Sequence, residues 1–313
     1  MRKLIIVGTV AFDAIETPFG KTDKILGGAA TYIALAAAQF KIDCGIVSVV
    51  GEDFPQAYID LFKERKINVG GLEIVPGGKS FFWSGKYKND MNTRDTLETQ
   101  LNVLADFDPV VPDRYKNAEI VMLGNLHPNV QLSVIEQVEN PQLIILDTMN
   151  FWMEHAMPEL EEVISKVDVI TINDEEARQL SGEYSLVKAA RKISEMGPKF
   201  VVIKKGEHGA LLFSGDEMFF APALPLEDIF DPTGAGDTFA GGFSGYLAKT
   251  GDLSFENMKN AVIHGSNLAS FCVEKFGAER MLDLSEAELQ TRLKKFEMLT
   301  RFSFDVEKEK IKG

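Results

Sequence analysis

Short apolar runs recur along the whole chain, and segments with a helical pattern separate most of them. These runs are rich in Val and Ile and lie at residues 4–7, 45–50, 120–123, 143–146, 167–172 and 200–203. Runs that are apolar on both faces are typical of parallel strands that helices cover on each side. The sequence therefore predicts an α/β fold with three layers, α/β/α, a central mostly parallel sheet and right-handed crossovers.

Helices are expected between these strands. The helical patterns cover residues 29–40, 238–247 and 261–273. Asp53 stands where it could cap a further helix that runs to about Arg65.

One region interrupts the alternation of strands and helices. Residues 79–104 mix aromatic, polar and small side chains, as in Phe81-Phe82-Trp83-Ser84-Gly85-Lys86-Tyr87. This pattern predicts antiparallel strands outside the main sheet, which would form a flap or lid. An ordinary hairpin insertion would have the same pattern.

Composition limits the class of protein. The 313 residues carry a net charge of −14, and such a surface repels nucleic acid and anionic membranes, so neither is expected as a partner. Cys44 and Cys272 lie far apart and without metal-ligand spacing, which fits a reducing compartment. The apolar run at 4–7 is too short for a signal peptide, and no stretch has the length of a membrane span. We therefore expect a cytoplasmic protein.

The most informative motif is Asp231-Pro232-Thr233-Gly234-Ala235-Gly236-Asp237, which a helical pattern follows. Pro232 keeps the chain out of a helix just before the Gly-Ala-Gly turn, whose small residues let backbone N–H groups approach a ligand. A glycine turn that leads into a helix N-terminus can bind the charge of a phosphoryl group in transfer. Asp237 would then accept the proton of an attacking hydroxyl. A helix N-cap with packing glycines is the simpler interpretation.

Other phosphate-binding motifs are absent from the sequence. Gly20-Lys21-Thr22 lacks the upstream glycine of a P-loop, since position 15 is Ile15. Gly8 is followed by Thr9-Val10-Ala11, which does not match a dinucleotide fingerprint.

Taken together, the motifs resemble the ribokinase-like, or PfkB, family of carbohydrate and nucleoside kinases. Residues 231–243 resemble its C-terminal signature, and Gly27-Gly28-Ala29-Ala30-Thr31 resembles its di-glycine segment. Gly51-Glu52-Asp53 after a strand is also typical of the family. The resemblance implies one kinase domain over residues 1–300, with lid segments at about 12–20 and 79–104. The charged tail at 301–313 would follow it.

The resemblance also implies roles for individual residues. Asp237 would be the catalytic base, and the amides of Gly234, Ala235 and Gly236 would form the anion hole. Asp13 would bind substrate hydroxyls, while Gly27 and Gly28 would line the substrate pocket. Asp231 would lie near a monovalent-cation site, with K⁺ the ion in question. ATP and Mg²⁺ are the implied cofactors.

Further implied ATP-site residues have simpler alternatives. Asn173 and Glu176 match the family's N-x-x-E motif, in which Glu176 acts on Mg²⁺ indirectly, but the same pair is a capping box. Lys205, Gly206 and Gly209 resemble the nucleotide loop, but a plain β-turn would look the same. The remaining implied nucleotide contacts are Thr233, at the phosphate turn, and Asn267, which could face adenine or simply be packed.

The acceptor is the least determined feature. Many sugar kinases of this family carry Asn at the position of Tyr32, so an aromatic residue there suggests a different sugar or a stacked base. Aromatic residues of the lid could seal a ring or form the seam of a homodimer. Arg94 could bring charge near a phosphate, or be exposed without a role. The sequence therefore predicts an ATP-dependent kinase of a small sugar, with two alternatives: a nucleoside kinase and a non-catalytic regulator of the same fold.

Overall fold

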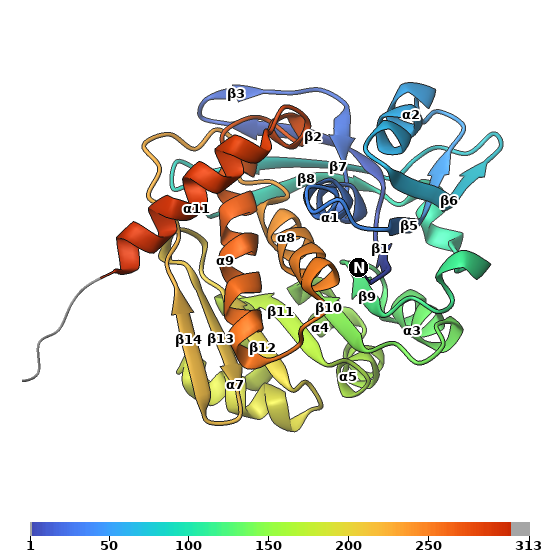
Figure 1. Cartoon of the computed structure of the whole chain (residues 1–313). Helices are drawn as coiled ribbons and strands as arrows, with labels where there is room; N and C mark the ends of the chain where they lie inside the picture. The colour runs from blue at the N-terminus through green and yellow to red at the C-terminus, as the bar shows by residue number, and fades with distance from the viewer. Residues whose placement is uncertain (1, 302–313) are drawn as a thin grey trace, which may run out of the picture.

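A nine-stranded sheet forms the centre of the computed structural model, which describes residues 2–301 (Figure 1). The strand order is β14-β13-β12-β11-β10-β9-β1-β5-β6. The strands are β1 (Leu4–Val7), β5 (Cys44–Gly51), β6 (Ile67–Val75), β9 (Ile120–Leu123), β10 (Leu143–Asp147), β11 (Val169–Asn173), β12 (Phe200–Lys204), β13 (Ala210–Ser214) and β14 (Glu217–Ala221). β13 pairs in antiparallel fashion with both β12 and β14, and the other pairings of this sheet are parallel, so the predicted mostly parallel sheet is confirmed.

Helices cover both faces of this sheet, because successive side chains of each buried strand point to opposite faces. Leu4 and Ile6 of β1 belong to one apolar cluster, whereas Ile5 and Val7 belong to the other. The first face carries α1 (Ala29–Ala38), α2 (Gln56–Glu64), α8 (Ala235–Thr250) and α9 (Phe255–Cys272). The second carries α3 (Pro128–Gln137), α4 (Asn150–His155), α5 (Met157–Ser165), α6 (Asp174–Ser181) and α7 (Leu186–Glu195). The three-layer prediction is therefore confirmed.

Two further helices, α10 (Glu279–Leu282) and α11 (Glu286–Thr300), follow α9, and α11 lies along its outer side (Figure 1). Short 3₁₀ turns lie at Asn102–Asp106, Asp113–Tyr115 and Gly206–His208. No helix within residues 2–301 has both the length and the apolar character to cross a membrane. The predicted charged tail lies outside the described residues, apart from residue 301.

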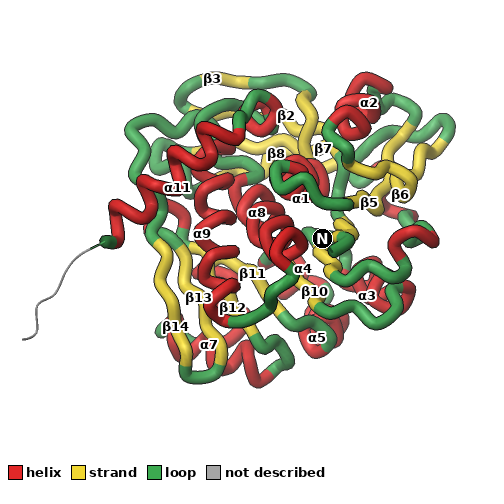
Figure 2. The backbone as a smooth tube through the Cα atoms, in the orientation of Figure 1, coloured by secondary structure: helices red, strands yellow, loops and turns green. Residues whose placement is uncertain are grey.

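A second, smaller sheet lies beside the carboxyl ends of the central strands, and we call it the lid (Figure 2). It consists of β2 (Ala11–Thr17), β3 (Gly20–Lys21), β4 (Ile25–Gly27), β7 (Phe82–Tyr87) and β8 (Arg94–Gln100). β7 and β8 form the antiparallel pair that the pattern of residues 79–104 predicts, whereas β2 and β7 are parallel. The two lid segments are far apart in the sequence, and this pairing joins them.

One helix start differs from the prediction. α2 begins at Gln56 after Pro55, and Asp53 does not cap it. The Asp53 carboxylate instead accepts hydrogen bonds from the N–H and the hydroxyl of Ser80, both at 2.7 Å. Pro55, whose φ is fixed near the helical value, starts α2 without a cap from Asp53. The Asp53 carboxylate therefore binds Ser80, which precedes strand β7 of the lid segment.

The helices α1 and α8 pack in close contact. A Cβ atom on Gly241 would lie 2.2 Å from the Ile33 carbonyl oxygen and 2.8 Å from the Cβ of Ala36. A Cβ on Gly245 would lie 2.8 Å from the Cα of Ala37. Later residues of α8 contact later residues of α1. The two helices therefore run in the same direction, with their N-termini together.

We predict that Gly241→Ala destabilises the protein although alanine is the better helix former. The gain in helix propensity is about 1 kcal/mol, whereas forcing a methyl group into a filled contact costs roughly 1–3 kcal/mol or more. Urea denaturation would measure the net loss. Lys249→Ala, at an exposed position of the same helix, should change the free energy of unfolding by less than about 0.5 kcal/mol. Equal stability of Gly241→Ala and the parent chain would contradict the close packing.

Candidate active site

Polar residues end several neighbouring strands of the central sheet. Asp147 ends β10, Asn173 ends β11 and Lys204 ends β12. These strands are parallel neighbours, so their last residues meet at one edge of the sheet. The lid and the N-terminus of α8 lie at the same edge, which makes this edge the candidate site.

The turn before α8 is built as an anion site. Gly234 has φ +74°, and a Cβ there would lie 2.4 Å from the ring of Tyr32, so only glycine fits. The Ala235 N–H donates to the Pro232 carbonyl at 3.2 Å and closes the turn. The N–H groups of Gly234, Gly236 and Asp237 donate to no acceptor in the described part of the chain. The predicted anion hole is therefore corrected: Ala235 shapes the turn, and Asp237 replaces it as a free donor.

Asp237 lies in the first turn of α8 and is partly buried. Burial raises the pKa of its carboxyl group most, the neighbouring Asp147 also raises it, and Lys204 and Arg94 lower it, with a net pKa of about 7. A carboxylate with such a pKa is a better proton acceptor near neutral pH than an ordinary aspartate. The raised pKa thus suits the predicted catalytic base, a role that stays a prediction.

Asp147 and Lys204 form a buried ion pair that the sequence analysis missed. The Lys204 Nζ lies 2.9 Å from Oδ2 and 3.2 Å from Oδ1 of Asp147. Burial opposes the charge on Lys204, but Asp147, Glu176 and Asp237 together raise its pKa. The sequence contains one indication of this pair, which is that a charged residue ends each of two buried strands.

Asn173 and Glu176 form the capping box of α6. The Glu176 N–H donates to Asn173 Oδ1 and the Asn173 N–H donates to Glu176 Oε2, both at 2.8 Å. Burial raises the pKa of Glu176 and Lys204 lowers it, with a net pKa of about 7. The capping interpretation is confirmed, and the same carboxylate faces the charged residues of the site.

The lid contacts the site at two places. The Thr233 hydroxyl donates to the Tyr87 hydroxyl at 3.1 Å, which ties β7 to the phosphate turn. The second place is the turn after β12, where the loop between β7 and β8 comes close. Asn92 Oδ1 of that loop lies 3.4 Å from the position that a Cβ on Gly206 would occupy. Arg94 of β8 is near enough to lower the pKa of both Asp237 and Glu176. The lid therefore brings a positive charge over the site.

The substrate-side residues lie at the N-terminus of α1. Asp13 is buried, and burial raises the pKa of its carboxyl group to about 7. A Cβ on Gly27 would lie 2.0 Å from Asp13 Oδ2, and Gly28 starts α1 with φ +91°. Both glycines are thus required where the predicted pocket residue meets the helix.

Tyr32 does not offer its ring to a substrate. Its side chain is 1% exposed and packs beneath Gly234. A ring enclosed in this way cannot stack on a base, so the prediction that Tyr32 binds substrate is wrong on packing grounds. Its hydroxyl has no hydrogen-bond partner in the described part of the chain.

Asn267 is also enclosed. It is 1% exposed and donates from Nδ2 to the Leu289 carbonyl of α11 at 3.2 Å. The amide therefore holds α11 against α9 and does not face a nucleotide, which corrects its predicted contact with adenine.

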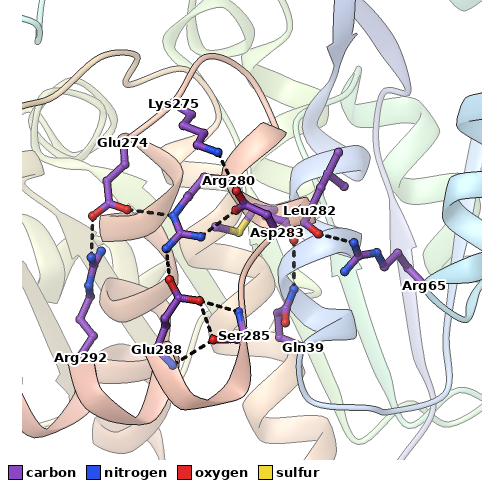
Figure 3. Close-up of polar contacts among 11 residues, drawn as sticks. Gln39, Arg65, Glu274, Lys275, Arg280, Leu282, Asp283, Ser285, Glu288 and Arg292 are labelled. Carbon is purple, nitrogen blue, oxygen red and sulfur yellow. Dashed lines mark hydrogen bonds and ion pairs between the residues drawn. The ribbon is translucent and has the colours of Figure 1, made fainter.

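Asp231 joins two loops. Its Oδ1 accepts from the Thr233 N–H at 2.9 Å, and its Oδ2 accepts from the Gly277 N–H at 2.8 Å. Ion pairs around Arg280 hold the segment that contains Gly277 (Figure 3). Asp231 thus fixes the start of the phosphate turn, and a cation beside it stays a prediction.

The loop of Lys205, Gly206 and Gly209 is a tight turn between β12 and β13. The Lys205 N–H donates to the Gly209 carbonyl at 2.8 Å. Gly206 and Gly209 have φ +53° and +83°, and a Cβ on Gly209 would lie 2.1 Å from the Ala221 carbonyl oxygen. The turn interpretation accounts for both glycines, and a nucleotide contact stays a prediction.

The family comparison agrees with this geometry. The model of the pfkB family carbohydrate kinases matches residues 1–284. The chain belongs to the pfkB family. It is a kinase of the carbohydrate and nucleoside class.

Relatives of this pfkB chain act on different acceptors. It is 31% identical over 251 residues to a cytidine kinase from Thermococcus kodakarensis, covering 79% of this chain and 89% of the relative. It is 25% identical to a ribokinase from Lactococcus lactis, covering 95% and 99%. A solved structure of a putative ribokinase II from E. coli, in complex with ATP and Mg²⁺, has a TM-score of 0.78 at 18% identity and covers 94% of this chain and all of that one.

We predict that Asp237→Asn raises stability at alkaline pH. The folded-state pKa is raised from 3.8 to about 7, so ionisation above pH 7 costs folding free energy that a neutral amide avoids. The full shift corresponds to about 4 kcal/mol, and partial solvation should reduce the gain to roughly 1–2 kcal/mol. Thermal unfolding at pH 8 would detect it.

The gain should shrink as the pH falls from 7 towards 4, because the carboxyl group of the parent protein then becomes protonated in the unfolded chain as well as in the folded one. Asp216→Asn, at an exposed turn, is the matched control and should show no such trend. A stabilisation that is constant from pH 4 to 8 would argue against a raised pKa at Asp237.

Proposed function

We propose that this chain transfers the terminal phosphoryl group of ATP, as its Mg²⁺ complex, to a ribose hydroxyl of a nucleoside. The observation that carries the transfer reaction is the carboxylate of Asp237 beside unused N–H donors at the start of α8. The nucleoside is supported by the similarity to a cytidine kinase.

The donors at this edge suit a triphosphate. The free N–H groups of Gly234, Gly236 and Asp237 can donate hydrogen bonds to phosphate oxygens at a helix N-terminus. Lys204 and Arg94 supply positive charge from two further elements. Mg²⁺ would supply additional charge neutralisation on the phosphates. The Lys205–Gly209 turn would then border the nucleotide from the side of β12.

The acceptor hydroxyl would lie between Asp13 and Asp237. Asp13 orients hydroxyl groups of the substrate from the side of α1. Asp237 takes the proton of the attacking hydroxyl. The oxygen of that hydroxyl bonds to the terminal phosphorus while the bond from this phosphorus to the leaving ADP oxygen breaks. The lid contacts at Thr233 and Gly206 close the site and exclude water, which would otherwise accept the phosphoryl group.

A small free sugar is the second candidate acceptor, supported by the ribokinase relative and by an Asp13 pocket that any polyol could use. Two finer points belong to the same proposal. K⁺ would bind beside Asp231, and a homodimer would form through the lid, where Leu97 of β8 is 58% exposed.

We predict that Asp237→Asn lowers kcat roughly 10²–10⁴-fold, the usual range for loss of a general base. ADP release would be followed with cytidine, other nucleosides and ribose as acceptors, at constant ATP and Mg²⁺. Retention of ATP binding by the variant would show that its fold is intact.

The panel separates the candidate functions. Turnover of nucleosides with little turnover of ribose supports the proposal, and the reverse order supports the sugar. Thermal stabilisation by a ligand without any turnover would favour a non-catalytic regulator. An unchanged kcat in Asp237→Asn would remove that residue from the role of base.

A further inference from the structure

The buried pair of Asp147 and Lys204 has an unusual place in the fold. The two residues end β10 and β12, so the pair spans β11, which lies between them. The side chain of Lys204 is 16% exposed and that of Asp147 is 7% exposed. Buried ion pairs contribute little net stability compared with apolar residues of similar size. A contribution to stability therefore does not explain why the charged pair of Asp147 and Lys204 lies at this edge of the sheet.

The ammonium group lies against the phosphate turn. Lys204 Nζ is 3.3 Å from the position that a Cβ on Gly236 would occupy. The free N–H groups of Gly236 and Asp237 belong to the same helical turn. A protonated amine beside free backbone donors offers one phosphate group several hydrogen bonds from different directions. Asp147 is too deeply buried to be a first contact for the ligand.

We propose that Lys204 binds the phosphoryl group in transfer, and that Asp147 is a positioning residue that holds the ammonium against the first turn of α8. A phosphate oxygen of bound ATP would accept a hydrogen bond from the Lys204 ammonium group, which has three N–H donors and stays bonded to Asp147 through the others. The inference rests on the ATP-dependent reaction proposed above and is independent of which acceptor is used.

The pair also acts on the base. Asp147 disfavours the ionised form of Asp237, and Lys204 favours it. Removing one partner should therefore shift the acid limb of the pH profile in the direction opposite to removal of the other. The charged and titratable groups that face Asp237 from the surrounding elements are Asp13, Tyr32, Arg94, Asp147, Lys204 and Cys272. Lys204→Met and Asp147→Asn each change one of these six groups and leave the other five in place.

The first test measures nucleotide binding by calorimetry, with ATP and with ADP, in the presence and absence of Mg²⁺. Lys204→Met should weaken ATP binding about 10–100-fold, the range for loss of one hydrogen bond to a charged group. It should weaken ADP binding much less, because ADP lacks the transferred phosphoryl. Asp147→Asn should weaken ATP binding less than Lys204→Met does, because the ammonium group is kept and the amide oxygen can still accept a hydrogen bond from it. Lys199→Met, at the exposed position just before the same strand, is the matched control and should bind like the parent chain.

A double variant separates a binding role from a structural one. Either single substitution leaves a buried charge unpaired and should lower the melting temperature. Combining Lys204→Met with Asp147→Asn removes both charges and should recover much of that loss without recovering ATP binding. Recovery of ATP binding together with stability would overturn the proposal.

The second test follows kcat/KM against pH. The acid limb should move to higher pH in Lys204→Met and to lower pH in Asp147→Asn. Shifts in the same direction, or equal losses of ATP and ADP affinity in Lys204→Met, would overturn the inference. If the parent chain binds no ATP, the proposed function itself fails. If it binds ATP and Lys204→Met binds equally well, only the role of Lys204 fails.

Discussion

The parallel contact between α1 and α8 is the constraint on which the site depends. Glycines at 241 and 245 let the two backbones approach, and Gly234 lies directly on the ring of Tyr32 at the start of α1. Both helix N-termini therefore open at one place, and the positive ends of two helix dipoles add there. Asp13 lies at the first N-terminus and Asp237 at the second. One packing interaction thus sets the separation between Asp13 and Asp237, the carboxylates to which we assign substrate recognition and phosphoryl transfer.

The site collects more negative charge than it neutralises. Burial raises the pKa values of Asp13, Glu176 and Asp237 to about 7. Folding such groups costs stability at neutral and alkaline pH, and Lys204 with Arg94 offsets only part of the cost. The positive charges of Lys204 and Arg94 and the free N–H groups at the start of α8 would face the phosphates of the proposed nucleotide at this edge. The burial that costs stability at this site also raises the pKa of Asp237, the residue that we propose as the base.

Much of the fold follows from the sequence because its strands are buried on both faces. The run at 120–123 matches β9 at both ends, and the run at 4–7 matches β1. Helix ends were harder to predict. Asp53 is a residue type that often caps a helix, yet Pro55 occupies the N-cap position of α2 and Asp53 accepts a hydrogen bond from Ser80 instead. That contact joins distant parts of the chain, and local pattern does not encode it.

The site shows the same division between local and long-range information. The turn at 231–237 is a contiguous motif, so its role in the site could be predicted from the residues. Tyr32 and Asn267 were misplaced because helical periodicity does not tell a pocket-facing residue from one enclosed by a later helix, α8 in one case and α11 in the other. Lys204 and Asp147 were missed for the converse reason. Each looks like an ordinary charge at the end of a strand, and only the order β10-β11-β12 brings them together at α8. Residues whose function depends on a partner across the sheet become recognisable once strand order is known, and the charged ends of adjacent parallel strands are the place to search for them.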